Sequence, residues 1–285
     1  MGTREWSHRE RSRPCPRDGT RGVFGRSVLT VSGDARPAAV VHPGVVTQFA
    51  VLDALLGGQY SSCITVRDAR ALGDTGIGCC ERFGGEVVIL DGEFFACTAD
   101  ESPRLMTDDE MLPFVDMCSF GEAASLTVRD LDGPALAEQI DGLLASRNLF
   151  HAIRVDGVMA RVRTRVTRRE EPPFRPLAEV TAEQIETVTR DVRGAVVGFW
   201  MPRLYQGVTV AGLHLHFLRD DRTFGGHVLE ISVREAVLRV SAYARFELRV
   251  PTDVEFLSQE LTHDEDRRIA AIEGGAAASS GGGKR

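Results

Sequence analysis

The stretch LHLHFLRDDRTFGGHV, residues 213–228, contains three of the seven histidines in the chain. Alternate residues of a β-strand point to opposite faces of its sheet, and neighbours on one face are about 7 Å apart. His214 and His216 therefore share one face of a predicted strand, and the leucines beside them share the other face with Phe217. The apolar set predicts a surface that faces a core. The histidine face has no such role and requires another explanation.

The residues after this strand predict a hairpin. A turn at Asp220-Asp221 would send the chain back as a partner strand. In that register His227 lies opposite His214. One glycine of Gly225-Gly226 then lies beside His216, where a missing side chain leaves room for an ion. Three imidazoles on one sheet face, with a fourth position open, are the arrangement of a catalytic zinc site.

Two alternatives to a zinc site remain open at this point. The cupin pattern also has a His-x-His pair, but it has a glutamate a few residues later, where this chain has Asp220. A surface hairpin with solvated histidines would need no metal, yet it leaves the alternation with leucine unexplained. The third histidine, which follows a glycine pair, favours the metal site over both alternatives.

The composition is that of an ordinary globular protein, with 285 residues, 43% of them hydrophobic, and a net charge of −7. This acidic balance gives no reason to expect binding to nucleic acid. No apolar run approaches the roughly 18 residues that span a bilayer, so no membrane association is expected. The six cysteines show no Cys-x-x-Cys spacing, which indicates reduced thiols in a cytoplasmic protein.

The chain is predicted to fold as one catalytic domain between two flexible ends. The first segment is rich in Arg, Gly and Pro and lacks apolar periodicity, and the last is rich in Gly, Ala and Ser. The segment Glu170–Pro173 interrupts the pattern and is predicted to separate two halves. The predicted parts are a disordered extension at 1–40, a catalytic domain at 41–274 with subdomains at about 41–170 and 171–274, and a tail at 275–285.

Apolar periodicity predicts three main helices in this domain. Asp132 is the candidate N-cap of the second helix, and Thr181 and Gln184 have the spacing of a capping box at the start of the third. The predicted helices are residues 45–58, 133–148 and 181–192.

Two Asp-Gly pairs predict hairpins. The first hairpin covers 84–99 and turns at Asp91-Gly92, and the second covers 149–169 and turns at Asp156-Gly157. Strands are expected to dominate from residue 194 to about residue 249. The predicted fold class is therefore α+β, with two closely packed sheet-rich subdomains, one mixed sheet and one antiparallel sheet, that form one catalytic unit.

Four segments of the chain resemble the alpha-acetolactate decarboxylase family. The longest, GFWMPRLYQGVTVAGLHLHFLRDDRTFGGHVLE (198–230), resembles the region where that family has a glycine-led His-x-His-Phe, a polar turn and Gly-Gly-His-Val-Leu. The other three, in chain order, are GEVVILDGEF (85–94), FHAIRVDGVMARVRTR (150–165) and IEGG (272–275). The resemblance runs over roughly residues 45 to 275, with all motifs in the family's order.

The resemblance implies the metal and its surroundings. It implies that His214, His216 and His227 hold a zinc ion. It also implies that Arg165 binds the substrate carboxylate and helps to deliver a proton, a task that suits the planar fork of a guanidinium. Arg165 lies in a run of five arginines, and only the resemblance selects it. Members of the family are homodimers, so a homodimer is expected.

Two glutamates match the family's pocket carboxylates, and three positions depart from the family. Glu86 and Glu273 match carboxylates that ligate the metal or its water and donate protons. The family's threonine before the first of them is Cys79 here, its phenylalanine is Cys80 and its aspartate is Gly84. If the threonine hydroxyl contacts substrate, a thiol in its place is a weaker hydrogen-bonding group. Substrate preference is the property that this change affects first.

The chemistry of the implied substrate agrees with a metal. Acetolactate is a 2-hydroxy-3-keto acid, and loss of CO2 leaves a carbanion beside its ketone. Enzymes stabilise such a carbanion with an imine lysine, with thiamine or with a Lewis-acid metal. The only lysine is Lys284, next to the C-terminus, and no nucleotide- or diphosphate-binding loop is evident. The resemblance, with which this chemistry agrees, therefore implies a zinc-dependent decarboxylase of acetoin biosynthesis that converts 2-acetolactate to acetoin and CO2.

The altered residues before Glu86 keep a second hypothesis open. A diverged, cupin-like sheet protein could bind a metal and keto acids without catalysing decarboxylation. The two hypotheses differ in one observable, the release of CO2.

Overall fold

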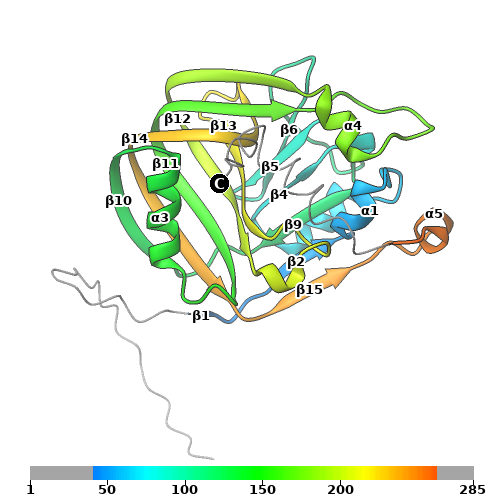
Figure 1. The fold of residues 1–285 in the computed structure, drawn as a ribbon, viewed down its shortest axis with the longest axis horizontal. Helices are drawn as coiled ribbons and strands as arrows, with labels where there is room; N and C mark the ends of the chain where they lie inside the picture. Colours follow the sequence, from blue (N-terminus) through cyan, green and yellow to red (C-terminus); the bar gives the residue numbers. More distant parts are fainter. Residues whose placement is uncertain (1–40, 262–285) are drawn as a thin grey trace, which may run out of the picture. The chain divides into compact units, whose positions relative to one another are not determined.

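The computed structural model describes residues 41–261, which contain two main sheets and one small sheet (Figure 1). The first main sheet has six strands: β1 (Val41–His42), β10 (Ala124–Leu131), β11 (Phe150–Val166), β12 (Ile185–Met201), β13 (Gly212–Arg219) and β14 (Gly225–Tyr243). The second has seven strands: β2 (Val46–Phe49), β4 (Thr75–Cys79), β5 (Glu86–Leu90), β6 (Glu93–Cys97), β7 (Arg104–Leu105), β9 (Phe114–Cys118) and β15 (Phe246–Arg249). The small sheet pairs β3 (Ile64–Thr65) with β8 (Met111–Leu112).

The six-stranded sheet closes on itself. Its order is β1-β14-β11-β12-β13, with β10 also paired to β14, and β13 pairs back with the start of β14. The four strands from β11 to β14 therefore form a ring. All of these pairings are antiparallel except the one between β1 and β14.

The seven-stranded sheet has the order β15-β2-β9-β4-β5-β6-β7, and only its β15–β2 pair is parallel. Each main sheet thus contains a parallel pair at one edge, so both are mixed. The predicted class of two packed, sheet-rich parts with few helices is confirmed, and the sheet expected to be purely antiparallel carries one parallel pair.

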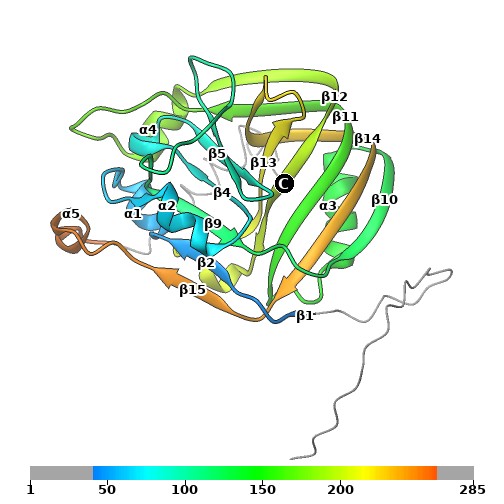
Figure 2. The ribbon, with the colours of Figure 1, turned by 180° about the vertical axis from the view of Figure 1, so that it is seen from behind.

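The two main sheets pack face to face around a shared core. Val46, Ile77 and Val88 of the seven-stranded sheet lie in one buried cluster with Val197 and Phe199 of β12. In Figure 2, β13 lies beside β5, and these two strands are in contact. Burial of this apolar surface stabilises the association of the sheets at roughly 25 cal/mol per Å².

Short helices cover the sheets. The helices are α1 (Leu52–Leu56), α2 (Val66–Ala69), α3 (Gly133–Leu143), α4 (Leu177–Ala182) and α5 (Val254–Ser258), with 3-10 turns at Arg70–Leu72, Glu81–Phe83 and Arg203–Tyr205. The predicted helix at 133–148 is confirmed as α3, although it ends earlier, at Leu143, and Asp132 caps it by accepting a 2.9 Å hydrogen bond from the Ala135 N–H. Leu136 and Ile140 of α3 pack into the core of the six-stranded sheet. Within residues 41–261, no helix has the length and apolarity needed to cross a membrane.

One predicted hairpin is confirmed and the other is wrong. Strands β5 and β6 turn at Asp91-Gly92, where both residues have positive φ, 53° and 81°, as a two-residue turn requires. Asp156-Gly157 lies inside the continuous strand β11 instead. Arg154 and Arg239 both donate to the Asp156 carboxylate. A Cβ at Gly157 would lie only 2.3 Å from the Glu235 carbonyl oxygen on β14. This Asp-Gly pair therefore does not form a turn: its aspartate pairs with two arginines, and its glycine allows β14 to pack closely against β11.

Two predicted helices are partly or wholly wrong. In 45–58 the first half is strand β2, the chain turns at Ala50 with φ 68°, and only α1 is helical. In 181–192 only the end of α4 is helical, since α4 ends at Ala182 and β12 begins at Ile185. Thr181 does not cap a helix, because its hydroxyl donates to the Leu177 carbonyl within α4. Pairing of β12 along β11 overrides the local helical pattern.

Strands on both sides of Glu170–Pro173 share the six-stranded sheet, because β11 pairs with β12 and β14. The division of the domain at that segment stays a prediction. The predicted extension at 1–40 and tail at 275–285 lie outside the described residues.

Candidate metal centre

The three histidines of the opening stretch converge where β13 meets β14. His216 and His227 are directly opposite each other in the strand pairing, and His214 lies two residues before His216 on the same face. One ring nitrogen from each of the three lies within 4.8 Å of the others. His214 Nε2 and His227 Nδ1 are 3.2 Å apart. Among the described residues, this is the group of three potential ligands that could hold a metal ion.

The hairpin register differs from the predicted one by two residues. The sequence predicted His227 opposite His214, whereas His227 lies opposite His216. The reason is the length of the loop, because the Arg219 N–H donates to the Phe224 carbonyl and leaves four residues between them. Asp221 stabilises this longer loop by accepting hydrogen bonds from the backbone N–H and the hydroxyl of Thr223. A shift by two residues keeps every side chain on its face, so the histidines still converge.

The glycine pair before His227 has a different role from the predicted one. Gly225 and Gly226 do not lie beside His216. A Cβ at Gly226, where φ is +140°, would lie 2.5 Å from the Arg165 carbonyl oxygen, and one at Gly225 would lie 2.6 Å from Cys97 Sγ. The glycines therefore allow β14 to approach its neighbours closely.

The surroundings of the rings favour neutral imidazoles with fixed orientation. His216 Nδ1 lies 2.9 Å from the Val87 carbonyl oxygen, so its N–H donates there and Nε2 points into the site. Burial, together with the nearby charge of Arg165, lowers the pKa of His214 to about 3. A neutral imidazole with its other nitrogen anchored on a carbonyl is the usual form of a metal ligand.

These residues fit a zinc ion. Two nitrogens bound to one tetrahedral zinc at about 2.0–2.1 Å lie roughly 3.3 Å apart. The 3.2 Å between His214 Nε2 and His227 Nδ1 agrees with that separation. Three histidine ligands with a remaining open position are typical of catalytic zinc. The geometry thus supports a metal site without identifying the metal.

Glu86 and Arg165 lie beside the histidines. Glu86, at the start of β5, is 4% exposed, and its Oε2 is 3.5 Å from His216 Nε2. Arg165, near the end of β11, is 2% exposed, and its Nε is 3.8 Å from Glu86 Oε1. Arg165 also lies opposite His227 in the strand pairing and donates to Gln184 Oε1 at 3.3 Å. The structure therefore brings Glu86, Arg165 and the histidines together from both sheets.

Burial separates Arg165 from the other arginines in its run. Arg161 and Arg163 form ion pairs with Glu230 on the outer surface of the sheet, and Arg163 also pairs with Glu186. Arg168 and Arg169 have side chains that are at least half exposed. Arg165 alone of the five points into the protein, a distinction that the sequence could not make.

Cys79 lines the cavity that contains Glu86, Arg165, His214 and His216. It lies directly opposite Glu86 in the pairing of β4 with β5. Burial raises the pKa of its thiol well above the usual range, and the neighbouring Glu86 carboxylate raises it further. The thiol is therefore neutral. It does not belong to the group of potential ligands found among the described residues.

Cys80 and Gly84, the other two positions that differ from the family, do not line this cavity. Cys80 is buried, and its Sγ is 3.8 Å from the Glu86 carbonyl oxygen. A Cβ at Gly84 would lie 3.0 Å from Arg169 Cβ, so an aspartate there would crowd that residue. Glu273, the second predicted pocket carboxylate, lies outside the described residues.

Sequence reasoning missed the apolar wall of the cavity. Its members come from five separate segments and share no motif, so no local signal could have found them. They are Leu52, Leu55, Phe83, Phe114, Leu177 and Val210.

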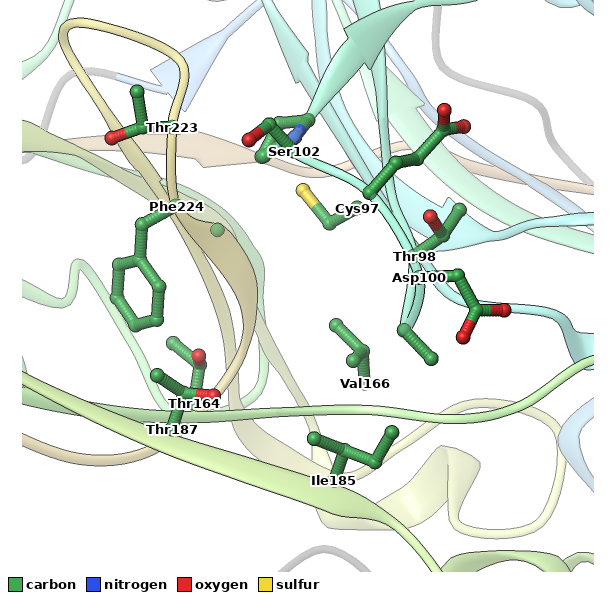
Figure 3. Close-up of a pocket in the computed structure, with 14 residues that line it drawn as sticks. Cys97, Thr98, Asp100, Ser102, Thr164, Val166, Ile185, Thr187, Thr223 and Phe224 are labelled. Carbon is green, nitrogen blue, oxygen red and sulfur yellow. The ribbon is translucent and has the colours of Figure 1, made fainter.

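Figure 3 shows a second cavity, which has a volume of about 380 Å³. Its lining includes Thr164, which precedes Arg165 on β11. It also includes Cys97 of β6, which lies opposite Glu86 of β5 in the strand pairing. Figure 3 shows hydroxyl groups, the Asp100 carboxylate and the Phe224 ring around it. Its lining contains none of the histidines, so it is distinct from the metal centre.

Comparison with known proteins agrees with this geometry. The model of the family described as alpha-acetolactate decarboxylase matches residues 46–263. The chain belongs to the alpha-acetolactate decarboxylase family. The alpha-acetolactate decarboxylase of Raoultella terrigena is 34% identical over 238 residues, which cover 81% of this chain and 91% of that protein. The enzyme of that name from Bacillus licheniformis is 32% identical over 231 residues, which cover 80% of this chain and 91% of that protein.

The fold of this chain also matches that of a family member of known structure. The crystal structure of alpha-acetolactate decarboxylase from Bacillus subtilis strain 168 superposes with a TM-score of 0.78 at 28% identity. The superposition covers 81% of this chain and 99% of that one. The two-sheet architecture of this chain is thus that of the alpha-acetolactate decarboxylase family.

Proposed function

We propose that this family member is a zinc-dependent decarboxylase that converts 2-acetolactate to acetoin and CO2. The observation that carries the proposal is the convergence of three histidine nitrogens within 4.8 Å of one another, beside the buried Glu86 and Arg165. Family membership over most of the chain supports the same assignment. The three histidines would hold the zinc ion, and the substrate is a small molecule.

The zinc ion that His214, His216 and His227 would hold would supply positive charge, which would stabilise the negative charge that develops on the substrate as CO2 leaves. An imine with a lysine, another common sink for that charge, is not supported by this sequence. Its only lysine, Lys284, is one residue from the C-terminus.

Arg165 binds the substrate carboxylate in this proposal. A buried guanidinium holds a carboxylate through two parallel N–H···O bonds, and these bonds are strong because little water competes for them. Arg165 is 2% exposed and is held in place by Gln184 and Glu86. This anchor fixes which carbon–carbon bond of the substrate lies in the site.

In this proposal Glu86 donates the proton that replaces CO2 on the substrate carbon. Decarboxylation leaves a carbon that must accept a proton, and a carboxyl group within hydrogen-bond reach of the substrate can donate it. The Glu86 carboxylate lies 3.5 Å from His216 Nε2 and 3.8 Å from Arg165 Nε, and this closeness to a proposed metal ligand and to the proposed carboxylate anchor supports the role. Glu273 would act as the second carboxyl if the C-terminal residues fold over the site.

We also propose that the protein is a cytoplasmic homodimer.

The test is direct. Zinc-loaded full-length protein is incubated with 2-acetolactate, and acetoin and CO2 are measured against a sample stripped of metal with a chelator. Acetoin formation that returns when zinc is restored supports the proposal. Zinc and keto-acid binding without release of CO2 would overturn it and favour a non-catalytic binding protein.

A further inference from the structure

Six apolar side chains line the cavity together with two of the histidines and form its apolar wall. Two of its side chains come from α1, one from α4 and the others from three connecting or strand segments. Each of them is less than 10% exposed. They are Leu52, Leu55, Phe83, Phe114, Leu177 and Val210.

The cavity is therefore lined by two chemically different sets of side chains. His214, His216, Glu86 and Arg165 form the polar set. In the proposed reaction, the carboxylate, hydroxyl and keto groups of the substrate all have partners in that set. What remains of the substrate is two methyl groups, one on the carbon that carries the hydroxyl and one on the ketone. These groups must lie against the apolar wall, where burial is favourable.

Hydrogen bonds to the backbone tie two parts of this wall together. The buried Gln48 donates from Nε2 to the Ala50 and Val208 carbonyl oxygens, each at 2.7 Å. The Leu52 N–H also donates to the Val208 carbonyl at 3.0 Å. The start of α1 and the segment that leads to Val210 are thus fixed to each other and to β2. A wall fixed in this way cannot yield readily to a larger alkyl group.

From this geometry we infer that Leu55 and Val210 set the size of the alkyl group that the site accepts on the hydroxyl-bearing carbon, so that it selects methyl over ethyl. Leu55 stands on α1 and Val210 on the segment tied to it, and both side chains line the cavity. The inference rests on the proposed function and adds the residues that decide between homologous substrates. One methylene in an apolar site typically changes kcat/KM by about 10- to 200-fold.

The experiment compares 2-acetolactate with its homologue that carries ethyl in place of the methyl on the hydroxyl-bearing carbon. The ratio of kcat/KM for the two substrates is measured for the zinc-loaded full chain and for Leu55→Ala and Val210→Ala. The unchanged protein is expected to prefer 2-acetolactate by about tenfold or more, and each variant to reduce that preference by about tenfold.

Leu56→Ala is the matched control. Leu56 is the next residue of α1, is 2% exposed and belongs to the same core cluster, but it does not line the cavity. It should lower stability by a similar amount and leave the substrate ratio unchanged. Leu55→Val, a smaller truncation, should move the ratio in the same direction if Leu55→Ala does not fold.

An unchanged ratio in active Leu55 and Val210 variants would overturn the inference while leaving the proposed function intact. An equal shift in Leu56→Ala would also overturn it, because the effect would then come from loosened packing in general. Absence of CO2 release from both substrates in the unchanged protein would refute the proposed function, and this inference with it.

Discussion

His216 Nε2 lies 3.5 Å from Glu86 Oε2, and this contact joins the two main sheets at the metal centre. His216 belongs to β13 of the six-stranded sheet and Glu86 to β5 of the seven-stranded one. The ring of His216 is also anchored across the same boundary, by the Val87 carbonyl oxygen. The metal ligands and the proposed proton donor are thus positioned by the packing of two sheets against each other.

Replacing His216 should remove the metal and the activity together. His216→Ala deletes one of three ligands, so zinc bound per chain should fall to background, with acetoin formation lost in parallel. Metal content by elemental analysis, activity, and far-UV circular dichroism would be measured on the same sample. His42→Ala, at a histidine outside the cluster, should keep its zinc. Full activity in metal-free His216→Ala would contradict the zinc assignment.

Replacing Arg165 by lysine should lower kcat/KM for 2-acetolactate by about 10²- to 10³-fold. The charge beside Glu86 is retained, but the planar fork that binds a carboxylate is lost. Steady-state kinetics would measure the effect. Arg163→Lys is the control, because Arg163 stands two residues earlier on the same strand and pairs on the surface with Glu186 and Glu230. Surface pairs contribute about 0–1 kcal/mol, so that variant should keep nearly full activity. Equal losses in both variants would argue against a special role for Arg165.

The parts of the site that depend on local periodicity could be predicted from the sequence. Alternation in a strand fixes which side chains share a face, so once residues 213–217 form a strand His214 and His216 must lie on the same face. The register of the partner strand depended instead on the bonds of Asp221 within its loop, which no pattern reveals. The error of two residues was harmless because a shift by two preserves the faces.

Non-local contacts explain the other errors. Asp91-Gly92 and Asp156-Gly157 are the same dipeptide between apolar runs, yet only the first turns. Asp156 is held in an extended strand by Arg154 and by Arg239, which is 83 residues away. The burial of Arg165 likewise depends on the second sheet closing over it, so the sequence alone could not distinguish it from Arg163.

The close approach of β14 to β11 gives a third prediction. Gly226→Ala would place a Cβ 2.5 Å from the Arg165 carbonyl oxygen at a φ of +140°, next to His227. The cost should be at least about 1–3 kcal/mol of unfolding free energy, with weaker zinc binding. Gly142→Ala is the opposite case, since nothing lies within 4 Å of its Cβ in the helix α3. It should stabilise the protein by about 0.5–1 kcal/mol. Urea unfolding measures the free energy of unfolding of both variants, which should fall for Gly226→Ala and rise for Gly142→Ala. A Gly226→Ala protein as stable as Gly142→Ala would contradict the close approach.

The buried carboxyl of Asp116 should make the protein less stable as the pH rises. Asp116 lies on β9 directly opposite the buried Gln48, is 1% exposed, and burial raises its pKa well above the usual range. Folded protein then keeps a proton that unfolded protein loses above about pH 4, so the free energy of unfolding falls with increasing pH until the raised pKa is passed.

Asp116→Asn is neutral at every pH and should remove this dependence. The variant should be more stable than the unchanged protein at about pH 8 and closer to it at about pH 5. Urea unfolding at the two pH values measures the difference. Glu93→Gln removes an exposed carboxylate on β6 and should leave the slope as it is. If Asp116→Asn keeps the full slope, Asp116 is ionised in the folded protein, and its burial beside Gln48 must then be compensated by a cation or by water.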